Sequence, residues 1–159
     1  MLNLEQAQAA ILAAVRRGSR TETVPLTQAL GRYVAAELRA RTDHPGFDNS
    51  AMDGYAMRTA DLAAHDFRLP LAGEARCGDA PGELAPGTAQ RIFTGAPLPA
   101  GADTVVMQED VQVESGAVTL PRSVAPDQNL RRRGEDFRLG DMLYAPGRRL
   151  SAWDLALLA

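Results

Sequence analysis

The pattern of apolar and polar positions predicts helices at both ends of the chain. Residues 3–17 carry apolar side chains at a spacing of three and four among polar ones, which predicts an amphipathic helix that ends near Gly18. A second helix is predicted over 27–33 with Thr27 as its cap, and a third begins at Ser151. The ends of the chain are therefore expected to be helical.

The middle of the chain, residues 42–129, has a different pattern. Eight prolines and many glycines interrupt it, and this density excludes long helices. Short apolar or alternating runs lie between these turn signals and predict strands, and Ser115-Gly116 predicts a two-residue hairpin turn. The predicted strands cover residues 67–72, 89–93, 104–108, 111–114 and 117–120.

The elements together predict a mainly β protein with flanking helices, in an irregular β-rich architecture of two subdomains. Residues 141–150 predict a further hairpin around Pro146-Gly147, and residues 34–41 fit a helix or a strand equally well. One subdomain is expected to be discontinuous. It consists of residues 1–41, the amino-terminal helices, and residues 139–159, the hairpin and last helix, while residues 42–138 form an inserted β-rich subdomain.

The last predicted helix stops inside its apolar face, which is the pattern of a fragment of a longer protein. We therefore expect apolar residues of the two terminal helices to lack part of their partner surface. They would stay exposed, pack against each other or be buried between copies, and a homodimer is the favoured outcome. These residues are Leu4, Ile11, Val15, Trp153, Leu157 and Leu158.

Composition and charge exclude several classes of function. The chain has 17 basic and 20 acidic residues and a net charge of -3, so we expect no nucleic-acid partner. All the basic residues are arginine, which excludes Schiff-base chemistry and a phosphate-loop lysine within this chain. Cys77 is the single cysteine, which favours a reducing cytoplasm. The longest apolar run, 9–15, is too short for a membrane span, so we expect no membrane association.

The segment from Asp48 to Tyr55 places two carboxylates among small polar side chains. A calcium loop is excluded, because Asp53 stands where such a loop requires glycine. The segment fits a turn stabilised by Asx side chains, with Gly54 permitting the turn, or a site in which Asp53 binds magnesium or orients a water. Histidine triads are not expected, and His44 and His65 are each predicted to be surface residues.

Two further segments carry candidate chemistry. In residues 91–103 a strand runs into a proline-stiffened loop, which is either a rigid connection or an anion site on the backbone amides around Gly95. The run Arg131–Arg133 stands beside Glu135 and Asp136. Such a run is either a solvated face or a phosphate clamp next to paired carboxylates, because guanidinium groups bind phosphate in a bidentate way.

Taken together, these segments resemble the molybdopterin molybdenumtransferase family, which includes MoeA and the gephyrin E domain. The resemblance covers essentially the whole chain in order. It rests on PGFDNSAMDGYA at residues 45–56, FTGAP at 93–97, GAD at 101–103, VVMQE at 105–109 and residues 129–136.

The resemblance implies the last step of molybdenum cofactor synthesis, in which adenylylated molybdopterin is hydrolysed and molybdate is inserted at its dithiolene with Mg²⁺. It also implies a homodimer with a cleft between the β-rich domain of one subunit and a central α/β domain of the other. That central domain, expected to hold most of the pterin and molybdate site, is not in this chain. The chain alone is therefore expected to be inactive.

Site residues follow from the resemblance position by position. Asp53, Thr94 and Asp136 match positions that the family uses in catalysis, and Asp53 is the expected metal ligand. Substrate binding is assigned to Asn49, Ser50, Gly95 and Arg131. The residues by themselves leave a different class open, a non-catalytic β-rich dimerisation or protein-interaction module that uses its proline-stiffened loops.

Overall fold

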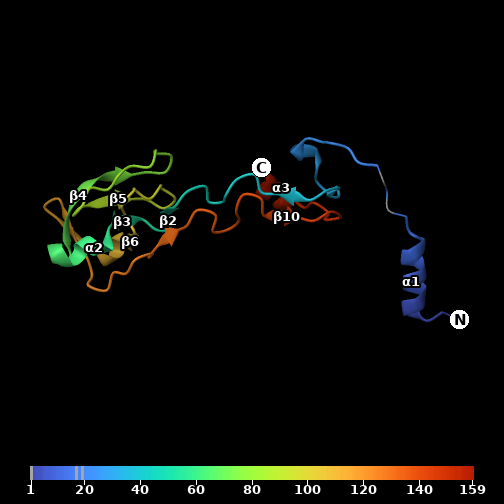
Figure 1. Cartoon of the computed structure of the whole chain (residues 1–159), viewed down its shortest axis with the longest axis horizontal. Coiled ribbons are helices and arrows are strands. Elements are labelled where there is room, and N and C mark those ends of the chain that lie inside the picture. The colour runs from blue at the N-terminus through green and yellow to red at the C-terminus, as the bar shows by residue number, and fades with distance from the viewer. Residues whose placement is uncertain (1, 17, 19) are drawn as a thin grey trace. The chain divides into compact units, whose positions relative to one another are not determined.

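The computed structural model describes residues 2–16, 18 and 20–159, and it divides the chain into two compact units (Figure 1). The first unit consists of Met1–Leu38 and Tyr144–Ala159, and the second of Arg39–Leu143. The first unit is thus discontinuous in sequence. The predicted subdomain boundaries, 41/42 and 138/139, stay a prediction for the organisation of the whole protein.

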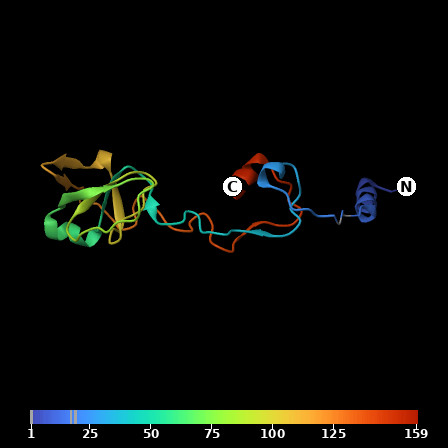
Figure 2. The same cartoon turned by 90° about the horizontal axis from the view of Figure 1, so that it is seen from above.

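The second unit is built on a six-stranded sheet of order β6-β3-β5-β4-β8-β7, gathered in one body in Figures 1 and 2. Strand β3 pairs antiparallel with β5 and β6, and β4 pairs parallel with β5 and antiparallel with β8. The strands are β3 (Gly54–Met57), β4 (Arg68–Ala75), β5 (Ala89–Ile92), β6 (Thr104–Met107), β7 (Gln112–Glu114) and β8 (Ala117–Thr119). All five predicted strands are present, with ends shifted by up to three residues.

Strand β3 was not expected, because its sequence carries turn signals. Gly54 does not bend the chain: it lies in the strand opposite Met107 and Ile92. A Cβ at this position would stand 2.1 Å from the carbonyl oxygen of Val106. Glycine is therefore required by the close approach of β6, and the interpretation of Gly54 as a turn residue is wrong.

The sheet of the second unit buries apolar side chains on both faces. Consecutive strand residues point to opposite faces. Ala56 and Val105 belong to one apolar cluster, whereas their neighbours Met57 and Val106 belong to another. All four side chains are buried. This two-sided burial fixes the positions of the loops at the strand ends.

Helical structure in the second unit is short, as the proline pattern predicts. It is limited to α2 (Thr59–Leu62) and two single turns, η2 (Ala63–His65) and η3 (Gln108–Asp110), among residues 39–143, all of which are described. The predicted hairpin turn between β7 and β8 is confirmed. Ser115 and Gly116 have φ values of 51° and 74°, the left-handed backbone that a two-residue hairpin turn requires.

Two short ribbons join segments that are distant in sequence. Strand β2 (Asn49–Ser50) pairs antiparallel with β9 (Leu130–Arg131), with Asn49 opposite Arg131 and Ser50 opposite Leu130. Strand β1 (Leu38–Arg39) pairs with β10 (Met142–Tyr144). The pairing of β2 with β9 brings the first and third sequence motifs together.

The first unit begins with α1 (Leu4–Ala14), which is capped by Asn3 and Gln6 in a reciprocal pair of hydrogen bonds. The helix ends before the predicted position, and Arg17, inside the predicted range, lies outside the described residues. Helix α1 buries none of its residues. The helix predicted over 27–33 is wrong, because only one turn, η1 (Leu26–Gln28), forms there.

Long-range backbone pairing explains why the helix predicted over 27–33 and the hairpin predicted within 141–150 do not form. The Gly31 N–H donates to the Leu150 carbonyl at 2.9 Å, and the Val34 N–H donates to the Arg148 carbonyl at 2.9 Å. These bonds and the antiparallel bridge between Tyr33 and Arg149 hold residues 32–34 against residues 148–150. The turn predicted at Pro146-Gly147 is present, with the Arg148 N–H donating to the Ala145 carbonyl at 3.3 Å, but the hairpin predicted within 141–150 is wrong. Its first arm, β10, pairs with β1, and its second arm pairs with 32–34.

The chain ends in α3 (Ala152–Leu158), and Ser151 caps it as predicted. The buried Asp154 carboxylate accepts hydrogen bonds from the Ser151 backbone N–H at 2.6 Å and the Ser151 hydroxyl at 2.7 Å. The Ser151 donors hold the pKa of Asp154 well below its usual range. Arg148 adds an ion pair at 3.0 Å.

The apolar residues of α1 and α3 are largely exposed. Leu158 packs against the small core of the first unit, formed by Ala29, Val34 and Leu150. The other five residues that were expected to lack a partner surface have exposed side chains, and Trp153 is 83% exposed. These five are Leu4, Ile11, Val15, Trp153 and Leu157.

Within the part of the chain that the structure describes, no helix has the length and apolar character needed to cross a bilayer.

Candidate functional site

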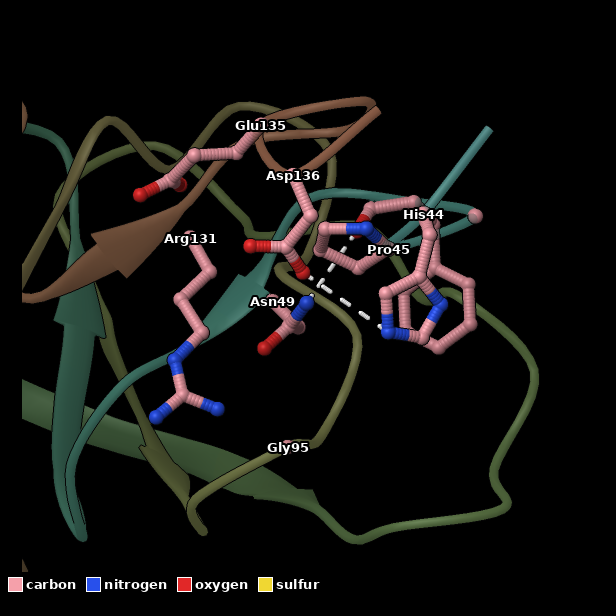
Figure 3. A pocket seen from close by; sticks show the side chains of 9 residues that line it. His44, Pro45, Asn49, Gly95, Arg131, Glu135 and Asp136 are labelled. Atoms are coloured by element: carbon pink, nitrogen blue, oxygen red, sulfur yellow. Dashed lines mark hydrogen bonds and ion pairs between the residues drawn. The ribbon is translucent and has the colours of Figure 1, made fainter. Parts of the chain in front are cut away.

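A pocket of about 550 Å³ lies in the second unit, beside the ribbon of β2 and β9 (Figure 3). Pairing of β2 with β9 places Asn49 and Arg131 side by side. Four of the seven predicted site residues line this pocket. The lining residues are His44, Pro45, Gly46, Phe47, Asn49, Gly95, Arg131, Glu135 and Asp136.

Arg131 lines the pocket with a guanidinium group that is free to bind a ligand. Among the described residues its guanidinium has no hydrogen-bond or ion-pair partner, and in Figure 3 the side chain points away from the carboxylates of Glu135 and Asp136. Asn49 is only 5% exposed, and its side-chain amide donates to the Phe47 carbonyl at 3.2 Å. The wall therefore presents one free guanidinium next to a fixed amide.

Two carboxylates close the other side of the pocket. The Asp136 N–H donates to the His44 carbonyl at 3.0 Å, which holds the two segments together. Oδ2 of Asp136 lies 3.7 Å from Nε2 of His44. Glu135 accepts a hydrogen bond from the Arg132 N–H at 2.7 Å. Both carboxylates are exposed to solvent in the pocket.

Asp53 and Thr94 form a separate pair next to the pocket. Oδ1 of Asp53 accepts hydrogen bonds from the Thr94 backbone N–H at 2.8 Å and from the Thr94 hydroxyl at 2.7 Å. These donors lower the pKa of the Asp53 carboxyl, so that it stays ionised. Neither residue lines the pocket, but Thr94 directly precedes Gly95, which does. Oδ2 of Asp53 has no hydrogen-bond partner among the described residues.

Ser50 connects these two groups through its backbone. Its carbonyl accepts a hydrogen bond from the Gly95 N–H at 2.8 Å, while its buried hydroxyl donates to the Met52 carbonyl at 2.6 Å. Since Thr94, Gly95 and Ala96 all donate their backbone N–H groups within the protein, the interpretation of this loop as an open set of anion-binding amides is wrong. Ser50 anchors the loop instead.

The other two arginines of the triple run are already paired with aspartates. Arg132 forms an ion pair with Asp48 at 2.5 Å and another with Asp127. Arg133 donates its backbone N–H to Asp48 at 2.8 Å and pairs with Asp43 at 2.6 Å. The predicted clamp of three guanidinium groups is therefore reduced to Arg131. The other two fasten the third motif to the first.

These contacts predict an acid-sensitive connection. Hydrogen bonds from the Arg133 N–H and the Arg132 guanidinium lower the pKa of Asp48. A carboxylate whose pKa is lowered by folding stabilises the folded state at pH values above its ordinary pKa. It loses that contribution as the pH falls through its pKa in the folded protein. We expect Asp48→Asn to be less stable than the wild type at pH 7, and we expect the difference in unfolding free energy to shrink as the pH falls below the ordinary pKa of 3.8.

Urea unfolding of both proteins at pH 7 and pH 3 measures this difference. The matched control is Asp66→Asn, which removes a highly exposed ion pair with Arg122 in the same unit. Such exposed pairs contribute little, so we expect no clear change at either pH. A difference between Asp48→Asn and the wild type that is equally large at both pH values would contradict the prediction.

Sequence reasoning missed several residues of the pocket wall. His44 is exposed, as predicted for a surface residue, but it also lines the pocket together with Pro45 and Phe47. Its position immediately before the first motif was the available signal. Glu135 lies inside the third motif next to Asp136, and only its neighbour was assigned a role.

The residues present fit a hydrated magnesium ion only as part of a complex with substrate. No group of three or more histidine, cysteine or acidic side chains that could hold a metal occurs among residues 2–16, 18 and 20–159. Mg²⁺ is commonly bound by one or two carboxylates together with substrate phosphates and water. Asp53, with Oδ1 fixed by Thr94 and Oδ2 free, suits such a role.

Comparison with known proteins identifies the family. Residues 2–159 match the family model described as the MoeA N-terminal region (domain I and II). The chain belongs to this family. It is 43% identical over 144 residues to a molybdopterin molybdenumtransferase of Synechococcus elongatus, covering 87% of this chain and 36% of that protein. A molybdopterin molybdenumtransferase of Haemophilus influenzae is 40% identical and matches 100% of this chain and 40% of its own length.

Solved structures of MoeA proteins confirm the mostly β fold. The molybdopterin biosynthesis moeA protein of Pyrococcus horikoshii OT3 superposes with a TM-score of 0.87 at 34% identity, covering 97% of this chain and 42% of that chain. A second MoeA structure from the same species gives a TM-score of 0.82 at 32% identity. The chain of this MoeA family member thus spans less than half the length of the relatives that it matches.

Proposed function

We propose that the protein acts in molybdenum cofactor synthesis as a molybdopterin molybdenumtransferase, which inserts molybdate into adenylylated molybdopterin. The relatives that carry this name support the activity. The observation that carries the proposal is the meeting of three motifs. The pairing of β2 with β9 puts four of the seven candidate residues on the wall of one pocket, and the hydrogen bonds from Thr94 to Asp53 and from Gly95 to Ser50 connect the other three to the loop that contains Gly95.

The roles of the residues follow from the chemistry of a phosphoanhydride. Hydrolysis requires that the phosphate oxygens be neutralised and that a water be held near phosphorus. Arg131 is free to bind phosphate oxygens, and Asn49 supports it from the opposite strand. Asp136 faces the same pocket and can orient the attacking water. Gly95 leaves the loop without a side chain at the pocket wall.

Asp53 and Thr94 are proposed as the second catalytic group. The two hydrogen bonds from Thr94 fix one carboxylate oxygen of Asp53 and leave the other to bind a hydrated Mg²⁺. When bound, Mg²⁺ would neutralise charge that develops on the phosphate oxygens. Ser50 contributes through the Gly95 loop, which its carbonyl holds in place.

The remaining proposals concern the whole protein. We propose that it works as a homodimer in the cytoplasm, and that the main molybdate site lies in a part of the protein outside this chain. Exposed apolar side chains of α1 and α3 support the dimer, because full burial of one such side chain contributes about 1.5 to 3 kcal/mol. Molybdate and adenylylated molybdopterin are the substrates.

A chimaeric enzyme tests this function directly. The 159-residue chain would replace the matching 40% of the Haemophilus influenzae relative, and the chimaera would be expressed in a bacterium that lacks molybdopterin molybdenumtransferase. We expect molybdenum cofactor to be restored, measured as the cofactor content of cell extracts. A folded chimaera that yields no cofactor would reject the proposal and favour the interaction-module alternative.

A further inference from the structure

The charges that line the pocket do not suit an anion at neutral pH. One guanidinium, that of Arg131, stands against the two carboxylates of Glu135 and Asp136. With a neutral imidazole at His44, these side chains carry a net charge of about -1, by the ordinary ionisation of such groups. A phosphate group bound by Arg131 would be repelled by these carboxylates. A second positive charge on the pocket wall would reduce this repulsion.

His44 is held in a position where it can supply that charge. Its backbone N–H donates to the Phe137 carbonyl at 2.8 Å, and its carbonyl accepts from the Asp136 N–H at 3.0 Å. The imidazole ring stacks on the Phe137 ring with centroids 5.3 Å apart. Backbone and ring contacts together hold the side chain, and Figure 3 shows the His44 ring at the pocket wall next to Asp136.

The imidazole also faces one of these two carboxylates. Nε2 of His44 lies 3.7 Å from Oδ2 of Asp136, and both side chains are more than 60% exposed. Histidine is the side chain whose charge ordinarily changes between pH 5 and 8. Protonation at this place would offset the Asp136 charge and change the net charge of the lining from about -1 to about 0.

We propose that His44 is a further anion-binding residue of this pocket, which acts with Arg131 when its imidazole is protonated. The pocket then binds a phosphate-type anion more tightly as the pH falls from 8 to 6. This inference rests on the proposed function, because it takes the pocket to be the phosphate-binding part of the site. His44 lies immediately before the first motif, residues 45–56, and is therefore an addition to the seven candidate residues.

The other charged groups around His44 do not produce the same pH dependence. Asp136 faces it at 3.7 Å, and Glu135 and Arg131 line the same pocket from the turn after β9 and from β9 itself. The neighbouring Asp43 is bound to Arg133 and to the Leu139 N–H, which hold its pKa below the ordinary range. Carboxylates and guanidinium groups keep their charge between pH 6 and 8.

Sulfate binding to the chain tests the proposal, because sulfate stays a dianion throughout this range. Backbone amide NMR spectra would be recorded during sulfate titrations at pH 6 and pH 8 in buffer with a metal chelator. For the wild type we expect binding about two- to fivefold tighter at pH 6, the effect of one partly exposed charge. Shifted amides should map to the pocket wall, including Gly95 and Arg131.

Variants separate the role of His44 from a structural one. His44→Gln should bind weakly at both pH values, and His44→Lys, which keeps a positive charge, should bind tightly at both. His65→Gln removes the other histidine, which lies in η2 outside the pocket, and should keep the wild-type pH dependence. The amide spectrum of each variant reports whether the fold is intact.

The possible results separate this inference from the proposed function. Sulfate binding at the pocket that does not depend on pH, or a pH dependence that persists in His44→Gln, would overturn the role of His44 and leave the Arg131 pocket in place. Sulfate binding away from the pocket would show an adventitious ion only, and would overturn it too. No binding by the wild type at either pH would overturn both this inference and the phosphate-binding role of the pocket.

Discussion

Asp53→Asn in the chimaeric enzyme is expected to lower molybdenum cofactor formation by roughly 100-fold or more, the usual contribution of a positioned catalytic carboxylate. Asparagine keeps the volume of the side chain and an oxygen that can accept the two hydrogen bonds from Thr94. The negative charge is lost, and an amide NH2 group takes the place of the free oxygen Oδ2. Cofactor content of extracts measures the activity, and thermal unfolding of the purified variant measures the stability.

Two variants control for this substitution. Asp66→Asn removes a carboxylate from the same unit, but from a position that does not line the pocket, and should leave cofactor formation unchanged. Thr94→Ser keeps the hydroxyl that donates to Asp53 and should be more active than Thr94→Ala, which removes it. Wild-type cofactor yield from a folded Asp53→Asn chimaera would show that Asp53 has no catalytic role.

Gly54→Ala is expected to destabilise the second unit by about 3 kcal/mol or more, at the upper end of the range for inserting a methyl group into a packed interior. The new Cβ would stand 2.1 Å from the Val106 carbonyl oxygen and 2.9 Å from its carbonyl carbon. Neither strand can move aside easily, because β3 lies between β5 and β6 and both faces of the sheet are buried. Urea unfolding of the chain measures the change.

Gly82→Ala is the matched control for that substitution. Gly82 lies in the same unit, a Cβ there would meet no atom within 4 Å, and its backbone does not require positive φ. We expect its stability to stay within about 0.5 kcal/mol of the wild type. Equal unfolding midpoints for the Gly54 and Gly82 variants would mean that β6 does not approach β3 as closely as the structure has it.

Asp53 and Gly54, the residues changed in these two predictions, are adjacent but have different roles. Asp53 is held by Thr94 at the end of β5, and Gly54 begins the strand that packs between β5 and β6. The Arg91 guanidinium donates to the Gly54 carbonyl at 2.9 Å and lies over the rings of Tyr55 and Phe93. The close packing that requires glycine therefore also fixes the carboxylate next to it.

Features that depend on interactions between neighbouring residues could be predicted from the amino-acid sequence. Prolines and glycines excluded long helices from the middle of the chain and marked the ends of five strands. Ser115-Gly116 closed the hairpin, and Ser151 capped the last helix, because both depend on interactions within four residues. The three motifs pointed to the family, which the comparison with known proteins confirms.

The pairing of distant segments does not follow from local patterns. Ser50 of β2 pairs with Leu130, 80 residues further along the chain, and residues 32–34 do not form the predicted helix because residues 148–150 bind their backbone. Arg132 and Arg133 are indistinguishable from Arg131 in the sequence, and ion pairs with Asp48 and Asp43 leave Arg131 as the arginine of this run that is free to bind. A local pattern fixes the shape of a segment, whereas long-range hydrogen bonds and ion pairs select which of its side chains reach the pocket.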